Sequence, residues 1–207
     1  MESNHSGQSS RAQLPGNPPP EGSVERALRL VRLFCPAVED FATLTAVAPE
    51  AVPAPYRELL DHTNHMTVVM EQFHGEPPHL QVVARGLTEA GARGDWYARE
   101  ILLLSAAGKV WQQGIVRIDL DQIDPATAAL IRQARLPLGR VLINAGLLRE
   151  VQHVALVKVV PGRHLATLFG GESGRVPAGS RATYGRVAEI SLGGVPAVEL
   201  LEIVAPG

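Results

Sequence analysis

The chain has 207 residues, of which 45% are hydrophobic and 19% charged, a composition typical of a globular protein that can bury a sizeable core. Its 19 basic and 21 acidic residues give a formal net charge of −2, which argues against nucleic acid or an anionic membrane surface as a partner. A single cysteine excludes a disulfide framework and a cysteine-rich zinc site.

The first segment, residues 1–22, is rich in Ser, Gly, Asn, Gln and Pro and cannot bury apolar area, which predicts a disordered tail. It has no apolar stretch of the kind that a secretory signal needs, and no apolar run elsewhere is long enough to span a membrane. We therefore expect a cytoplasmic protein in which residues 23–207 form a single domain.

Helices are predicted in the first part of the chain and again in its middle. Ser23 is placed to cap a helix that Pro36 ends, and a proline-rich connector leads to one or two short helices between residues 56 and 73. Asp124, followed by a proline, opens another helix, and a further helical segment follows Pro137.

Six segments have the alternation or the aliphatic content of strands. Two pairs of them are joined by turns of hairpin length, at 106–109 and 193–196, which implies antiparallel pairing. Because the helices are grouped, we expect an α+β fold, a six-stranded antiparallel sheet with helices packed on one face. The glycine-rich stretch Gly162–Gly179 is expected to be a long loop, of the kind that often forms a lid. The strands are expected at 80–85, Trp96–Leu104, Val110–Asp119, Val151–Val160, Tyr184–Leu192 and Ala197–Val204.

Three groups of side chains that could suggest metal or nucleophile chemistry have simpler explanations. The histidines lack a further ligand, the aspartates lack the glycine and glutamate of a calcium loop, and the cysteine lies at an apolar helix end. We therefore expect surface or capping histidines, turn and cap aspartates, a buried thiol, and no metal. These residues are His62, His65 and His74; Asp119, Asp121 and Asp124; and Cys35.

Two charged residues fall on apolar strand faces. Arg99 shares its face with Tyr97 and Ile101, and such an arginine needs either an internal carboxylate or an anionic ligand. Its planar fork suits bidentate capture of a carboxylate. Glu202 shares a face with apolar residues of the last strand and could act as a general acid or base. The simpler alternative is an Arg99–Glu202 ion pair, or edge residues that face water.

Several short segments occur in an order that resembles the chorismate lyase family, and together they cover most of residues 60–206. The strongest of these is Trp96–Leu103, which is similar to that family's strand Y-W-L-R-E-I-L-L. The others are Thr63–Thr67 followed by Glu71, Gly108–Gly114, Leu136–Arg140, Tyr184–Arg186, and Leu192–Pro196 ending in Glu202–Pro206.

The resemblance implies a reaction as well as a fold: an enzyme that splits chorismate into 4-hydroxybenzoate and pyruvate without a cofactor or metal. We also expect the protein to be a monomer. The resemblance implies that Arg99 and the backbone amides of Met66 and Leu138 bind the ring carboxylate. It also implies that Glu202 contacts the ring hydroxyl and transfers the proton, so that Arg99 and Glu202 are the catalytic residues. Fixing the anion and placing one carboxyl group beside the breaking bond suit this chemistry.

One departure from the family concerns the last hairpin, where the stretch from Pro196 to Glu202 is one residue longer. With strict alternation, one extra residue reverses the face on which a side chain lies. A β-bulge would restore Glu202 to the expected face; otherwise Glu199 would serve instead.

A second hypothesis is a non-enzymatic domain on the same fold that binds or senses an aromatic carboxylate, like the effector domains of some transcription regulators. Residues 1–60 contain no convincing helix-turn-helix, which argues against a regulator. A third hypothesis, a structural or protein-interaction domain, explains neither Arg99 nor the segment Leu136–Arg140.

Overall fold

The computed structural model describes residues 22–87, 96–147, 149–170 and 181–206. The expected tail therefore lies outside the described residues, apart from residue 22. Seven strands form one sheet: β1 (Ala42–Val47), β2 (His79–Leu87), β3 (Trp96–Leu104), β4 (Val110–Asp119), β5 (Arg149–Pro161), β6 (Thr183–Leu192) and β7 (Val195–Val204).

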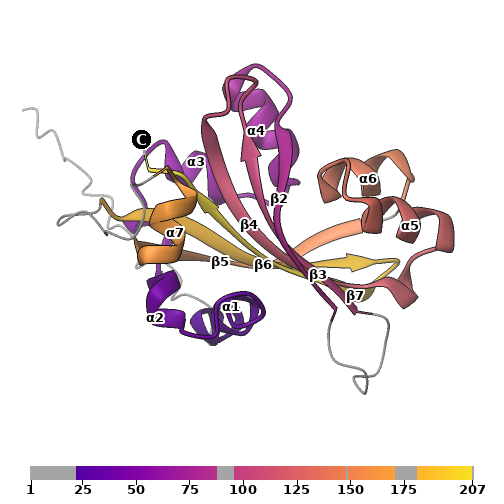
Figure 1. Cartoon of the computed structure of the whole chain (residues 1–207), viewed down its shortest axis with the longest axis horizontal. Coiled ribbons are helices and arrows are strands. Elements are labelled where there is room, and N and C mark those ends of the chain that lie inside the picture. Colours follow the sequence, from indigo (N-terminus) through magenta and orange to yellow (C-terminus); the bar gives the residue numbers. More distant parts are fainter. Residues whose placement is uncertain (1–21, 88–95, 148, 171–180, 207) are drawn as a thin grey trace, which may run out of the picture.

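All neighbouring strands are antiparallel, in the order β1-β5-β6-β7-β4-β3-β2 (Figure 1). The predicted α+β class with an antiparallel sheet is therefore confirmed. The six predicted strands correspond to β2–β7, and the turns between β3 and β4 and between β6 and β7 are tight hairpins. In the second turn, Gly193 and Gly194 have φ of 58° and 86°, the left-handed pair that a two-residue hairpin favours.

The sheet has one strand more than the six expected. The extra strand is β1, which lies in the stretch that the sequence predicts to be a connector. Its residues Ala-Thr-Leu-Thr-Ala alternate between apolar and polar, which was a signal for a strand, and the 13-residue β5 extends far enough to pair with all six residues of β1. Pairing with this long neighbour stabilises the strand.

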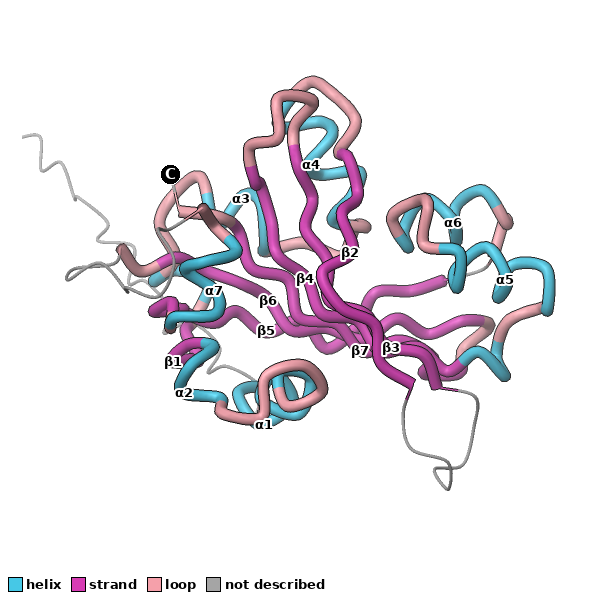
Figure 2. Tube along the Cα trace, in the orientation of Figure 1, coloured by secondary structure: helices cyan, strands magenta, loops and turns pink. Residues whose placement is uncertain are grey.

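The expectation that helices cover one face of the sheet is wrong, because helices lie on both faces (Figures 1 and 2). On β7, Leu200 packs in a cluster with α5 and α6, whereas its neighbour Leu201 packs on the other face with α1 and α7. Strands with buried side chains on both faces need cover on both. The helices are α1 (Ser23–Val31), α2 (Val38–Phe41), α3 (Tyr56–Leu60), α4 (Met66–His74), α5 (Pro125–Gln133), α6 (Leu138–Asn144) and α7 (Arg163–Leu168), with 3-10 turns at Pro49–Ala51 and Leu120–Gln122.

Two of the helices show how the site is framed. α3 and α4 pack with Leu103, Trp111 and Val204 at one end of the sheet. α5 begins as expected, because the side chain of Asp124 accepts a hydrogen bond from the Thr127 amide at 3.0 Å.

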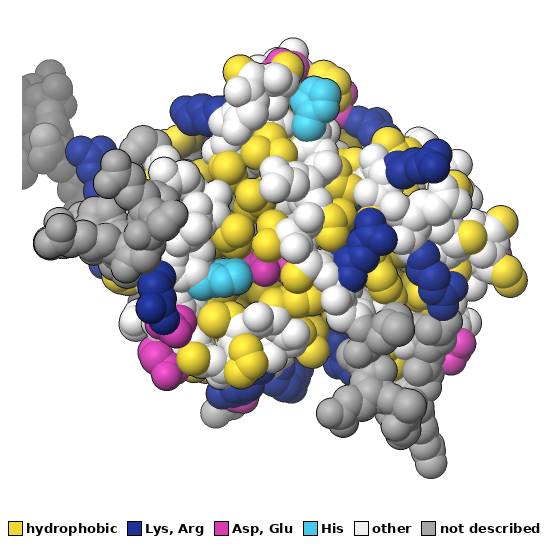
Figure 3. All heavy atoms as spheres, viewed as in Figure 1, with side chains coloured by type: hydrophobic (Ala, Val, Ile, Leu, Met, Phe, Trp, Pro, Cys, Tyr) yellow, Lys and Arg dark blue, Asp and Glu magenta, His cyan; other side chains and the backbone are white. Residues whose placement is uncertain are grey.

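Among the described residues, no helix is long and apolar enough to cross a membrane. In the view of Figure 3, hydrophobic side chains gather over the strands between α4 and α1.

The expected long loop Gly162–Gly179 is partly helical, since α7 occupies its first part. Residues 171–179 lie outside the described residues. Gly162 is required where this segment passes α2: its amide donates to the Phe41 carbonyl at 2.8 Å, and a Cβ there would lie only 2.4 Å from the Asp40 carbonyl oxygen.

We expect Gly162→Ala to destabilise the protein by about 2–3 kcal/mol, because neither backbone segment can retreat without losing its hydrogen bond. Gly146→Ala is the matched control, with a left-handed φ of 63° but no atom near its Cβ; it should cost about 1 kcal/mol. Urea unfolding of the two variants measures the difference, and equal losses would contradict the steric explanation.

Candidate functional site

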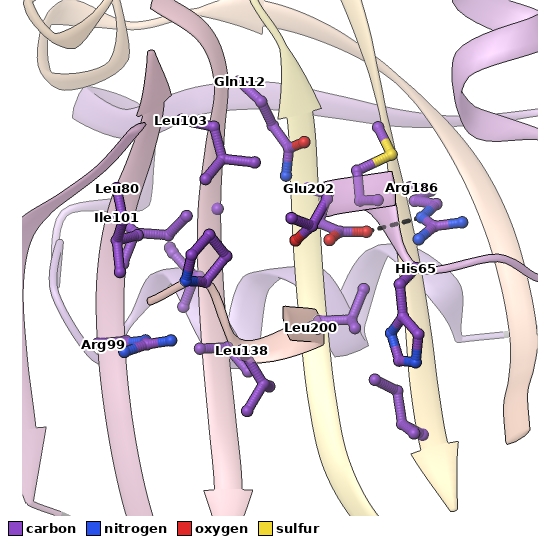
Figure 4. Close-up of a pocket in the computed structure, with 18 of the residues that line it drawn as sticks. His65, Leu80, Arg99, Ile101, Leu103, Gln112, Leu138, Arg186, Leu200 and Glu202 are labelled. Atoms are coloured by element: carbon purple, nitrogen blue, oxygen red, sulfur yellow. Dashed lines mark hydrogen bonds and ion pairs between the residues drawn. The ribbon is translucent and has the colours of Figure 1, made fainter. Parts of the chain in front are cut away.

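A cavity lies between the face of the sheet that carries Arg99 and the starts of α4 and α6 (Figure 4). It encloses about 590 Å³ of empty space, its open mouth included. Its walls are mostly aliphatic, and a few polar groups point into it, which is the usual character of a small-molecule pocket. The lining includes Met66, Leu80, Arg99, Ile101, Leu103, Gln112, Gly114, Leu138, Arg186, Leu200 and Glu202.

The hollow arises from the arrangement of three cross-strand rows on β3, β4 and β7. Arg99, Val116 and Leu200 form the first row. The second row is Ile101, Gly114 and Glu202, and the third contains Gln112. Because Gly114 has no side chain, the middle of the second row is open, and a Cβ there would touch the Ile101 side chain at 3.4 Å.

Arg99 is the charged group at one end of the cavity, and its residue is 1% exposed. Its terminal nitrogens donate to the carbonyls of Ile131 and Leu136, both at 3.4 Å, and its Nε has no partner within the part of the chain that the structure describes. Burial lowers the pKa of Arg99, while neighbouring Tyr97 acts in the opposite direction. No carboxylate of the described residues pairs with this guanidinium, so the Arg99–Glu202 ion pair that the sequence allowed is not formed.

The starts of two helices face the same cavity. Met66 and Leu138 are the first residues of α4 and α6, and both line the cavity. The residues before them, His65 and Pro137, make no side-chain capping hydrogen bond to either helix. The two starts lie close together, since a Cβ on Gly139 would be 3.2 Å from that of His65. Uncapped first-turn amides attract anions.

An ion pair between Arg140 of α6 and Glu71 of α4 holds these two helices together. Both residues belong to the segments that resemble the chorismate lyase family. Neither side chain lines the cavity. Their contact is structural, since it fixes the position of one helix start relative to the other.

Glu202 lies at the other side of the cavity and is engaged by Arg186 (Figure 4). The Nε of Arg186 donates to Glu202 Oε2 at 2.7 Å. The two terminal nitrogens of Arg186 donate to the carbonyls of His62 at 2.9 Å and Asn64 at 3.1 Å. Arg186 as a whole is 1% exposed. Arg186 thus links β6, β7 and the loop that leads into α4, and the sequence analysis missed it as a part of the site.

A β-bulge on β7 determines which of Glu202 and Glu199 lies on the cavity face of the strand. The pairing with β6 shifts between Pro196 and Val198, so that Ala197 is the extra residue. Glu202 lines the cavity as a result. Glu199 is outside it and pairs with Arg117 at 2.9 Å.

Gln112 is a second residue of the cavity that the sequence analysis missed. It is 1% exposed, and its Oε1 has no hydrogen-bond partner among the residues that the structure describes. It lies on the same face of β4 as Gly114 and Val116, so its polar side chain on an otherwise apolar face was the signal that could have revealed it.

Of the three histidines expected at the surface or as caps, His74 is exposed, whereas His62 and His65 are partly buried and His65 also lines the cavity. Arg186 donates to His62 Nδ1, His65 contacts Arg149, and His74 stacks on Trp111 with ring centres 3.9 Å apart. Burial lowers the pKa of all three histidines. Asp119 accepts from the Asp121 amide, and Cys35 is buried. Within the described ranges, no group of three or more histidine, cysteine or acidic residues could hold a metal ion.

A separate polar cluster lies on the opposite face of the sheet. Glu100, 1% exposed, accepts hydrogen bonds at 2.9 Å from His164 of α7 and from the buried Gln113. The hydrogen bond to Glu100 raises the pKa of His164. This pair secures α7 against the sheet.

We expect the stability of the protein to fall as the pH rises above the ordinary His value of 6.5. The folded pKa of His164 is raised, so its contribution is complete below that value and is lost as the pH rises through the folded pKa. The free energy of unfolding, measured in urea on both sides of neutral pH, checks this. In His164→Gln the decline in this window should disappear; an unchanged decline would contradict the assignment. The pKa values of His62 and His65 are lowered, so these two histidines change the free energy of unfolding only below the ordinary His value and do not contribute to this decline.

No protein-family model matches the chain, and no curated protein matches it. Several solved structures are similar to part of the chain. The effector domain of PhnF from Mycobacterium smegmatis has 12% identity and a TM-score of 0.47, over 69% of this chain and 88% of that one. The C-terminal domain of the histidine utilization repressor from Pseudomonas syringae has 12% identity and a TM-score of 0.44, over 62% and 91%. The ligand-binding domain of a putative GntR-family regulator from Bordetella bronchiseptica has 13% identity and a TM-score of 0.44, over 61% and 85%.

The expectation of a chorismate pyruvate-lyase is contradicted. The solved structures named here are domains of transcriptional regulators, and none is described as a lyase.

Proposed function

We propose that this chain is a non-enzymatic binding domain for a small aromatic carboxylate. The observation that carries the proposal is Arg99: a guanidinium removed from water, facing an apolar cavity, with two long contacts and no counter-ion among the described residues. Burying such a charge is costly, and an anionic ligand would offset that cost.

The surrounding groups favour a flat, carboxylate-bearing ligand. A carboxylate beside Arg99 would accept two parallel hydrogen bonds from its fork, with the uncapped amides at Met66 and Leu138 as further donors. The aliphatic side chains of Ile101 and Leu200 would enclose the rest of the molecule. The polar groups are few and lie at the ends, which suits a single ring better than a sugar or a nucleotide.

A sensing role fits this architecture. The bound carboxylate would be held jointly by β3 and by the starts of α4 and α6, so that occupancy would fix these helices against the sheet. Two of the similar solved structures are described as the effector domain of PhnF and the ligand-binding domain of a putative GntR-family transcriptional regulator. The absence of a nucleic-acid partner and a monomeric state stay predictions, as does the single domain over residues 23–207.

Calorimetric titration of the full chain with benzoate, 4-hydroxybenzoate and the neutral benzamide tests the proposal. We expect binding of both carboxylates and at least tenfold weaker binding of benzamide, since it lacks the charge that Arg99 requires. Equal affinities for benzoate and benzamide would overturn the proposal. Release of pyruvate from chorismate by the same preparation would contradict its non-enzymatic character.

A further inference from the structure

One side of the ligand cavity borders a second pocket. This pocket lies between the first turn of α4, the last turn of α6 and the start of β5, and it encloses about 1010 Å³ of empty space, its open side included. Thr63, Asn64 and Glu150 line it and are exposed, so it opens to solvent. His65 and Val151 line both the second pocket and the cavity, which places these two residues between them.

His65 is the one of these two residues whose side chain can move by itself. Val151 is paired with Ile190 within the sheet, whereas His65 lies in the loop that leads into α4. In Figure 4 the ring of His65 is on the side of the cavity away from Arg99. A turn of this ring to another rotamer would join the cavity to the second pocket without moving a strand or a helix.

Two neighbours hold the ring where it closes the cavity. The Nε of Arg149 donates to His65 Nε2 at 2.5 Å, and Nη1 of the same guanidinium donates to the Leu147 carbonyl at 3.0 Å. On its other side His65 packs against the start of α6, where a Cβ on Gly139 would be 3.2 Å from the Cβ of His65 and 3.3 Å from its Cγ. Turning the ring aside therefore costs one hydrogen bond, the one from Arg149.

The other walls of the cavity are harder to open. One wall is the hydrogen-bonded sheet, and its separation would break several backbone hydrogen bonds between β3, β4 and β7. The starts of α4 and α6 form another wall, and the ion pair between Arg140 and Glu71 joins these helices. Because each of these movements breaks more contacts than the single hydrogen bond to His65, rotation of His65 is the least costly opening.

We infer that His65 is a side-chain gate, and that the ligand enters and leaves the cavity through the second pocket when this ring turns aside. The inference rests on the proposed function. A gate lies on the path of the ligand and contributes little to the bound state. Its removal should therefore raise the rates of association and dissociation by the same factor and leave the affinity nearly unchanged.

Stopped-flow fluorescence of the full chain mixed with 4-hydroxybenzoate measures the two rates, and calorimetric titration measures the affinity. In His65→Ala both rates should rise about tenfold, the factor that corresponds to one lost hydrogen bond, while the dissociation constant changes less than about threefold. Arg149→Met frees the ring but keeps it in place, so both rates should rise by a smaller factor. His79→Ala is the matched control and should leave the rates unchanged, because His79 is an exposed histidine of β2 outside both pockets.

The outcomes separate the gate from the proposed function. If wild type does not bind 4-hydroxybenzoate, the proposed function fails, and the gate fails with it. If wild type binds and His65→Ala leaves both rates unchanged, the proposed function stands, but the ligand uses another route and the gate is overturned. A rise in the dissociation rate alone, with a proportional loss of affinity, would make His65 a ligand contact and would also overturn the gate.

Discussion

Arg99→Met should weaken the binding of benzoate and 4-hydroxybenzoate by about 100-fold or more, since it removes the charged fork and leaves the ligand carboxylate in an apolar cavity. The free protein should lose little stability, because methionine fills similar space and the removed guanidinium is buried with no counter-ion in the described ranges. Calorimetric titration and urea unfolding measure the two effects.

Arg85→Met is the matched control for this variant. Arg85 pairs with Arg99 across the β2–β3 register but is exposed and does not line the cavity. Its loss should change the affinity by less than about threefold, as expected of an exposed charge. If both variants lose affinity equally, the anion responds to the general positive field and not to a specific site at Arg99.

Arg186→Ala should have the largest effect on folding, a loss of about 3–5 kcal/mol, because it leaves the Glu202 carboxylate without its cation and two loop carbonyls without a donor. Urea unfolding measures the loss. Arg186→Lys should restore only part of the stability, since a point charge cannot bridge three acceptors on different segments.

A double-mutant cycle with Glu202→Gln separates the two roles of Arg186. If the ion pair dominates, the combined variant should be less destabilised than the sum of the single ones. Strict additivity would show that Arg186 acts mainly through the carbonyls of His62 and Asn64, as an anchor for the loop that leads into α4.

Local patterns predicted much of the fold and part of the candidate site. Alternation identified β2–β7, and turn chemistry identified the two hairpins, because both depend on neighbours in sequence. Arg99 was predicted as a charge on an apolar face, and the structure places it in the cavity lining with Met66, Leu138 and Glu202. Its role in binding stays a prediction.

The features that were missed depend on contacts between distant segments. β1, whose own alternation was a signal for a strand, is stabilised by the long β5 beside it, and the helices on the second face are needed because Leu201 and its neighbours are buried there. The partnership of Arg186 with Glu202 and with the loop before α4 joins residues up to 124 positions apart. No pattern along one strand contains that information.

The extra residue in the last hairpin shows how spacing along a chain and position in space can separate. Ala197 occupies the irregular pairing, 1% exposed, and every side chain after it keeps the side that it would have without the insertion. A related chain that lacks this one residue and the irregularity would therefore present the same carboxylate to the same hollow. An alignment of such a chain with this one should place the gap at the bulged residue, Ala197, so that Glu202 stays in register.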